Sequence, residues 1–101
     1  MKDSVSATDG GITIAIADKL TFEDHTKFRD LLKLIESKDH KSCRFDLQGL
    51  ITIDSAGLGM LMIAFETAEK AGVSFQIYKP GGQVKQLLDI SEFDKVMTIV
   101  S

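Results

Sequence analysis

The chain has 101 residues, the length of one small domain, because a compact chain of this size has a radius of gyration of only about 13 Å. Hydrophobic residues make up 44% of the chain and charged residues 27%, which excludes a disordered or low-complexity chain and predicts a folded core. The 12 Lys and Arg against 15 Asp and Glu give a formal net charge of −3 without a basic block, which argues against nucleic-acid binding.

The cysteine, the two histidines and the hydropathy pattern exclude further classes of protein. The single Cys43 cannot form an internal disulfide, and the sequence shows no charged-then-apolar leader and no apolar run of about 18 residues. We therefore expect a cytoplasmic protein that does not enter a membrane. Cys43, His25 and His40 do not have the spacing of metal ligands such as CxxC or HExxH, so neither a metal nor another cofactor is expected.

The N-terminal residues predict a β-hairpin. Residues 12–17 alternate Ile with Thr or Ala, the period-2 pattern of a strand with one buried face. The Asp9-Gly10-Gly11 sequence before them is typical of a hairpin turn, with residues 5–8 as the first arm. Because this arm is weakly patterned, a loose N-terminus is the alternative.

A helix is expected over residues 22–37. Thr21 and Asp24 nearly match a capping box, and Lys33 and Lys38 near the end suit the helix macrodipole. His25 is expected to be a partly buried helix residue without a catalytic role. The buried stripe comprises Phe22, Phe28, Leu31, Leu32 and Ile35.

The rest of the chain alternates strands and helices. Strands are expected over 43–48, 73–78 and 96–100, with an apolar bend at 50–53, a helix ending before Gly72 and a short helix around Val84. This order predicts an α/β domain in which helices pack on a mixed, partly parallel sheet of four or five strands. The sequence indicates no obvious helix after the last strand.

The junction before the second long helix carries a hydroxyl beside two glycines, in the sequence Asp54-Ser55-Ala56-Gly57-Leu58-Gly59. The first N–H groups of a helix lack internal acceptors and lie at the positive end of its dipole. A phosphate on Ser55 is well placed to bind there if Gly57 and Gly59 leave these donors uncovered. The alternative is that Ser55 is only an N-cap and that the glycines only allow close packing on the sheet.

The second long helix carries more apolar residues than one buried stripe needs. If partly exposed, Leu58, Met62 or Phe65 would form a protein-docking patch beside Ser55, and flexible Met suits such a surface. The alternative is a helix buried on two sides. The residues concerned are Leu58, Leu61, Met62, Ile63, Ala64 and Phe65.

The motif resembles the signature of a known family. The stretch IDSAGLGML over 53–61, after Phe45-Asp46-Leu47, resembles the STAS domain, and more closely the single-domain anti-sigma factor antagonists of bacteria. LLDISEF over 87–93 is similar to the family's segment before the last strand. The resemblance covers nearly the whole chain and implies one STAS domain over residues 1–101.

This resemblance implies a switch protein that is not an enzyme. In the family, the serine after the motif's aspartate, here Ser55, is phosphorylated by a partner that is both anti-sigma factor and ATPase-type serine kinase, and a PP2C-type phosphatase reverses the modification. The unphosphorylated form binds the kinase and releases the sigma factor. The phosphate adds a charge of about −1.5 to −2 to an apolar patch, and desolvating that charge opposes docking. The expected partner-binding residues are Asp54, Ala56, Gly57, Leu58, Gly59, Met62, Phe65 and Thr21.

Two features depart from the family pattern. Members usually carry a G-E-L-D-like segment before the first helix, where this chain has Asp18-Lys19-Leu20-Thr21, which alters the polar surroundings of Ser55. Many members continue into a C-terminal helix, whereas this sequence ends at Ser101 just after the last strand. An open docking edge is then expected, with a monomer or a weak homodimer in solution.

Other functions fit the sequence less well. The sequence does not distinguish a switch that acts on an anti-sigma factor from the same switch acting on a partner in biofilm formation, motility or secretion. A nucleotide-binding sensor module is disfavoured because Gly81-Gly82 and Gly57-x-Gly59 match no phosphate-binding motif. A hydrolase with Ser55 as nucleophile fails because Ile53 occupies the first glycine position of G-x-S-x-G and no His follows Ser55.

Overall fold

A computed structural model describes residues 1–37 and 39–101, so Lys38, expected near the end of the first helix, lies outside the described residues. Its strands are β1 (Lys2–Thr8), β2 (Gly11–Leu20), β3 (Ser42–Asp46), β4 (Leu50–Ile53), β5 (Ser74–Tyr78) and β6 (Thr98–Val100). Its helices are α1 (His25–Glu36), α2 (Ser55–Ala71) and α3 (Gly82–Ile90), with the 3-10 turns η1 (Phe22–Asp24) and η2 (Phe93–Lys95).

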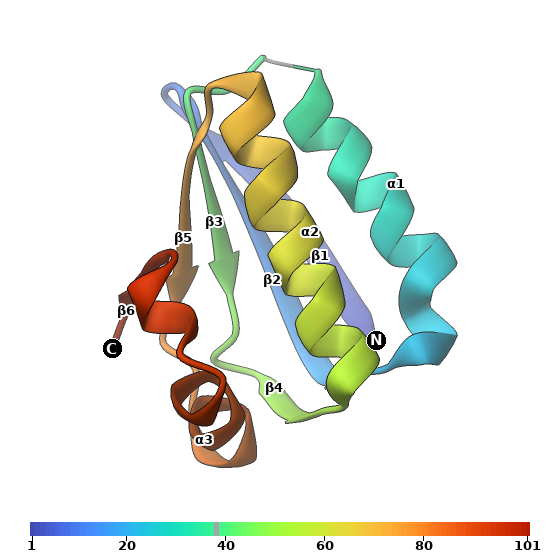
Figure 1. Cartoon of the computed structure of the whole chain (residues 1–101). Coiled ribbons are helices and arrows are strands. Elements are labelled where there is room, and N and C mark those ends of the chain that lie inside the picture. Colours follow the sequence, from blue (N-terminus) through green and yellow to red (C-terminus); the bar gives the residue numbers. More distant parts are fainter. Residues whose placement is uncertain (38) are drawn as a thin grey trace.

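The described residues form a mixed sheet with α1 and α2 side by side on one face, while α3 lies at the end of the sheet near β4 (Figure 1). The strand order is β1-β2-β3-β5-β6, and β4 pairs with β2 beyond the end of β3. Only the β1–β2 pair is antiparallel among these pairings. The α/β class and the mixed sheet are confirmed.

The N-terminal hairpin is regular. Strands β1 and β2 pair without a break from Lys2 opposite Ala17 to Thr8 opposite Gly11. Gly10 has a φ of +77°, a conformation that glycine adopts without a steric penalty, which explains the tight turn. The hairpin prediction is confirmed with a longer first arm, and the alternative of a loose N-terminus is wrong.

The described sheet has six strands, one more than the upper limit of the prediction. Residues 50–53, expected to form a bend, pair with the second half of β2 as strand β4. The physical reason is length, because β2 has ten residues and β3 has five, which leaves an edge of β2 open. Asp18 lies at a register shift within the β2–β4 pairing with a φ of +74°, and its amide donates to the Gly49 carbonyl at 2.9 Å.

The core lies between the sheet and the two helices. Phe28 of α1 packs on Phe45 of β3 with ring centroids 5.8 Å apart, and both side chains are buried. Removing such a side chain from water stabilises the fold by about 1.5 to 3 kcal/mol. The same layer contains Ile12, Ile14, Ile16, Leu31, Ile35, Leu61, Ala64, Ala68 and Ile77.

Phe22 and His25 do not join the buried stripe of the first helix. Phe22 is 66% exposed, and His25, also exposed, stacks on it with ring centroids 5.0 Å apart. Residues 22–24 form a 3-10 turn with about three residues per turn, so Phe22 is out of phase with the stripe that begins at Phe28. The prediction that both residues are partly or fully buried is therefore wrong.

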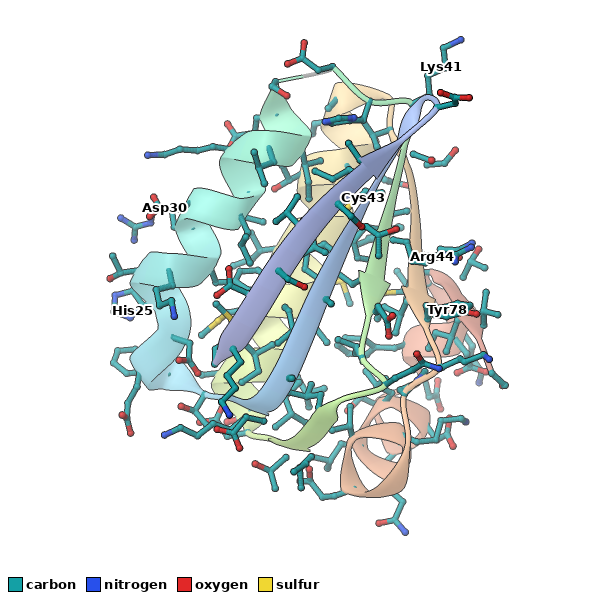
Figure 2. The ribbon with its side chains drawn as sticks, turned by 180° about the vertical axis from the view of Figure 1, so that it is seen from behind. His25, Asp30, Lys41, Cys43, Arg44 and Tyr78 are labelled. Atoms are coloured by element: carbon teal, nitrogen blue, oxygen red, sulfur yellow. The ribbon has the colours of Figure 1, made fainter. Side chains whose placement is uncertain are left out.

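Figure 2 shows the opposite face of the sheet, across which no helix runs within residues 1–37 and 39–101. Arg44 and Tyr78 lie close together there, with the guanidinium carbon 4.2 Å from the ring centroid. The Arg44 Nε atom also donates to the Gln76 side chain at 2.7 Å. No helix in the described ranges is both long and apolar enough to cross a membrane.

Candidate functional site

Asp54 determines the geometry at the start of α2. It is the N-cap residue, and its Oδ1 atom accepts a hydrogen bond from the Gly57 amide at 2.8 Å. Its Oδ2 atom accepts a second hydrogen bond, from the Phe22 amide at 3.3 Å. The prediction that Ser55 caps this helix is wrong, because a carboxylate with two acceptor oxygens occupies the N-cap position.

Ser55 is the first residue of α2 and is exposed. Within residues 1–37 and 39–101, its hydroxyl forms no hydrogen bond. The amides of Ser55 and Ala56 also lack a protein acceptor in these ranges, as the first amides of a helix do. An anion attached to the hydroxyl would therefore lie at the positive end of the helix dipole, beside two available donors.

The two glycines of the motif have different roles. A Cβ atom on Gly57 would lie 2.4 Å from the Leu20 carbonyl oxygen and 2.6 Å from Cγ1 of Ile53, so Gly57 allows α2 to approach the sheet. Its amide is bonded to Asp54, and the prediction that Gly57 leaves this donor uncovered is wrong. Gly59 is exposed, and a Cβ atom there would meet nothing within 4 Å.

The remaining predicted residues of α2 point in three different directions around the helix axis. Each residue turns by about 100°, so Gly59 and Met62 share the solvent-facing line of Ser55. Leu58 and Phe65 lie on the flank away from α1, whereas Ala56 lies on the α1 side. Leu58, Met62, Phe65 and Ala56 are all half-buried.

Phe65 does not lie beside Ser55. It is ten residues further along α2, a distance of about 15 Å. Its ring packs edge-on against the Phe75 ring of β5, with centroids 6.0 Å apart. The structure thus places Asp54, Ala56, Leu58 and Gly59 within about one turn of Ser55, Met62 about two turns along its line, and Phe65 elsewhere.

Thr21 is half-buried at the N-cap position of η1, next to the Phe22 amide that Asp54 binds. Its own amide donates to Asp24 Oδ2 at 2.9 Å, which confirms the predicted pairing of Thr21 with Asp24. Asp24 is buried and also lies 3.0 Å from the Met1 amino group. Burial alone would raise the pKa of Asp24, but the Thr21 hydrogen bond and the Met1 charge outweigh it and lower the pKa.

Two exposed apolar residues near the site were not among the predicted partner-binding residues. Phe22 is attached through its amide to Asp54, and Ile63 is 50% exposed on the α1 side of α2. A groove of about 200 Å³ between the two helices is bordered by Ile63 and by His25, on which Phe22 stacks. It is lined by His25, Phe28, Arg29, Leu32, Met60 and Ile63.

The period of the α-helix could have indicated that Phe22 and Ile63 are exposed. Phe22 precedes Phe28 by six positions, which places it about 120° away from the buried stripe on a helix. Ile63 is likewise turned by about 100° from Ala64, which is fully buried. In the described ranges, no group of three or more His, Cys, Asp or Glu side chains could hold a metal ion.

Comparison with known proteins assigns the family. The family model of the STAS domain matches residues 4–101, so the chain belongs to the STAS domain family. A STAS-domain containing protein of Pseudomonas aeruginosa (strain UCBPP-PA14) is 27% identical over 94 residues, which cover 93% of this chain and 92% of the relative. The resemblance recognised in the sequence is confirmed.

Solved structures of anti-sigma factor antagonists share the fold. The antagonist from Mycobacterium paratuberculosis superposes with a TM-score of 0.86 at 15% identity, covering 98% of this chain and 84% of that one. The Bacillus cell fate determinant SpoIIAA in its phosphorylated form gives a TM-score of 0.76 at 14% identity, covering 99% of this chain and 92% of that one. At these identities, the likeness shows the fold.

Proposed function

We propose that this protein is a phosphorylation-controlled partner-switching regulator with Ser55 as the acceptor. The observation that carries the proposal is the exposed Ser55 hydroxyl at the first position of α2, without a hydrogen bond in the described ranges and next to two available amides. In this account the unphosphorylated protein binds an anti-sigma factor that is also an ATPase-type serine kinase, and so releases a sigma factor. A PP2C-type phosphatase restores the binding form.

The cap at Asp54 supports a switch that leaves the fold unchanged. Because Asp54 and not Ser55 holds the Gly57 amide, modification of the Ser55 hydroxyl removes no capping hydrogen bond. The added phosphate is also exposed to solvent, where it carries no burial cost in the free protein. The effect of phosphorylation is then expected on docking and not on stability.

The surface around Ser55 suits a protein partner. Phe22 and Ile63 present apolar side chains, half-buried Met62 lies on the line of Ser55, and Gly59 exposes bare backbone for close approach. A phosphate adds a charge of about −1.5 to −2 to this surface, next to the Asp54 carboxylate. Covering that charge with an apolar partner costs desolvation energy, so the phosphorylated form is released.

The proteins that share this fold favour regulation of a sigma factor over regulation of another kind of partner. The M. paratuberculosis protein is an anti-sigma factor antagonist, and so is the Bacillus cell fate determinant SpoIIAA, whose structure is known in phosphorylated and unphosphorylated forms. The same switch acting on a biofilm, motility or secretion partner is the second candidate. In both cases the protein is a ligand and a kinase substrate, and performs no catalysis.

The test is affinity capture from native lysate with Ser55→Ala and Ser55→Glu as parallel baits and mass spectrometry of the retained proteins. Ser6→Ala and Ser6→Glu, at an exposed position of β1, are the matched controls. We expect an ATPase-type serine kinase on the Ser55→Ala bait and on both controls, and not on Ser55→Glu. Equal retention of the same partners on both Ser55 baits would refute the proposal.

A further inference from the structure

A large groove lies on the flank of α2 that faces away from α1. Figure 1 shows α2 between α1 and the segment that contains η2 and β6. The groove has a volume of about 580 Å³ and runs along the second half of α2, the start of β5 and the η2–β6 segment. Its lining includes Phe65, Glu69, Phe75, Asp94, Val96 and Ile99.

Half-buried apolar side chains lie on the floor of this groove among polar residues, which include Ser74 and Thr98. Phe65 and Phe75 pack edge-on, and both rings are half-buried, as is Ile99 of β6. Val96 on the rim is 50% exposed. By contrast, Phe28 and Phe45, beneath the cover of α1 and α2, are 2% and 0% exposed. A partner that covered the floor would therefore remove further apolar surface from water.

The rim of the groove is acidic. Glu69 and Asp94 are exposed, and neither forms an ion pair within residues 1–37 and 39–101. Lys95 also lines the groove, but its Nζ atom lies 3.1 Å from the Glu92 carboxylate, which balances its charge. Two carboxylates without an ion pair therefore border the half-buried rings of Phe65 and Phe75, and an occupant with positive charges on its flanks is complementary to them.

From this arrangement we infer a second docking surface, which accepts an amphipathic helix of a partner protein that carries Lys or Arg beside its apolar stripe. A helix suits the place because the groove lies alongside α2, where a neighbouring helix packs at about 8 to 10 Å between axes. Its apolar residues at i, i+3, i+4 and i+7 would contact Phe65, Phe75 and Ile99. Its basic residues would then face Glu69 and Asp94.

This surface lies outside the Ser55 site, so it goes beyond the proposed function. Phe65 and Glu69 follow Ser55 by ten and fourteen residues, about 15 and 21 Å along the helix. Phe65 also lies on the flank of α2, about 80° around the helix from Ser55, and Glu69 is turned about 40° from Ser55 toward the same flank. A partner held here remains bound when Ser55 is phosphorylated, while the Ser55 partner is released.

The test uses two fluorescein-labelled helical peptides of about 18 residues, one with a Leu stripe flanked by Lys and a twin with Glu in place of every Lys. Fluorescence anisotropy measures their affinity for the full chain, for the double variant Glu69→Lys with Asp94→Lys, and for a control. The control, Glu36→Lys with Asp39→Lys, makes the same change in net charge at two exposed positions, the last residue of α1 and a residue beyond its end.

We expect the Lys peptide to bind the wild type, the Glu36/Asp39 control and Ser55→Glu equally, and the Glu69/Asp94 variant at least about tenfold more weakly. The Glu twin is expected to prefer the Glu69/Asp94 variant. Equal losses for both double variants, or no binding of the Lys peptide, would overturn the inference. So would a concentration-dependent dimer of the free protein that Val96→Asp dissociates in sedimentation, because the occupant would then be a second copy.

Discussion

The Asp54 carboxylate accepts a hydrogen bond from the backbone amide of Phe22 at 3.3 Å. Because the same carboxylate binds the Gly57 amide at 2.8 Å, one side chain joins the start of η1 to the first turn of α2. Phe22 exposes 66% of its surface, so this bond fixes an exposed apolar group near Ser55. The residue beside the proposed phosphorylation site thus organises the surface that the phosphate is expected to control.

Replacing Asp54 tests this arrangement. Asp54→Ala removes the acceptor of both amides and is expected to lower the free energy of unfolding by about 1 to 2 kcal/mol, whereas Asp54→Asn keeps an oxygen for Gly57 and loses less. Urea unfolding measures the free energies, and the amide shift of Phe22 reports its hydrogen bond. An Asp54→Ala protein as stable as the wild type would show that the cap is not important.

The two motif glycines are expected to respond in opposite directions. Gly57→Ala places Cβ 2.4 Å from the Leu20 carbonyl oxygen and should destabilise the protein by about 1 to 3 kcal/mol. Gly59→Ala meets no atom within 4 Å and should stabilise the protein by about 0.5 to 1 kcal/mol, because alanine favours a helix. Urea titrations of both variants decide this, and a loss of stability in Gly59→Ala would contradict the open space seen there.

Periodicity in the sequence predicts most of this fold, because the Ile alternation of β2 and the stripe from Phe28 to Ile35 each report one buried face. Strand β4 was missed because residues 50–53 have no clear period and their partners in β2 lie 32 or 33 positions earlier. Whether such a segment bends or pairs depends on an edge left open by unequal strand lengths, which is a tertiary property.

The sequence predicted the motif of the candidate site but not which residue within it has which structural role. Ser55 and Asp54 are both good N-cap residues, and only the position of the Phe22 amide shows why Asp54 is favoured. The different roles of Gly57 and Gly59 depend on which side of α2 faces Leu20. The exposure of Phe22, by contrast, was predictable, because six positions before Phe28 it lies about 120° away from the buried stripe of a helix.

The stability of the protein should depend on the ionisation of Asp24. Its pKa lies below the ordinary 3.8, because its hydrogen bond to Thr21 and the Met1 amino group outweigh the effect of burial. A lowered pKa in the folded state gives stability that is present above about pH 4 and is lost as the pH falls through the folded pKa. Urea unfolding between about pH 5 and pH 2 should show a steeper loss for the wild type than for Asp24→Asn. Parallel pH profiles of the two proteins would exclude this role.

Cys43 is expected to be chemically protected in the folded state. It is 1% exposed, and burial raises the pKa of its thiol to about 12. Because the thiolate is the reactive species, iodoacetamide at about pH 8 should label the folded protein far more slowly than the urea-unfolded chain. Mass spectrometry follows the labelling, and the destabilised Gly57→Ala should react faster than the wild type. Equal rates in the folded and unfolded protein would show that Cys43 is accessible.

The central claim is that a phosphate on Ser55 prevents docking without disturbing the fold. The direct measurement is calorimetric titration of the kinase partner captured by the Ser55→Ala bait, against the chain with phosphoserine incorporated at position 55 and against the unmodified chain. The account predicts an affinity loss of at least about a hundredfold with an unchanged thermal unfolding midpoint. Equal affinities of the two forms, or a phosphoserine form that has lost its folded structure, would contradict it.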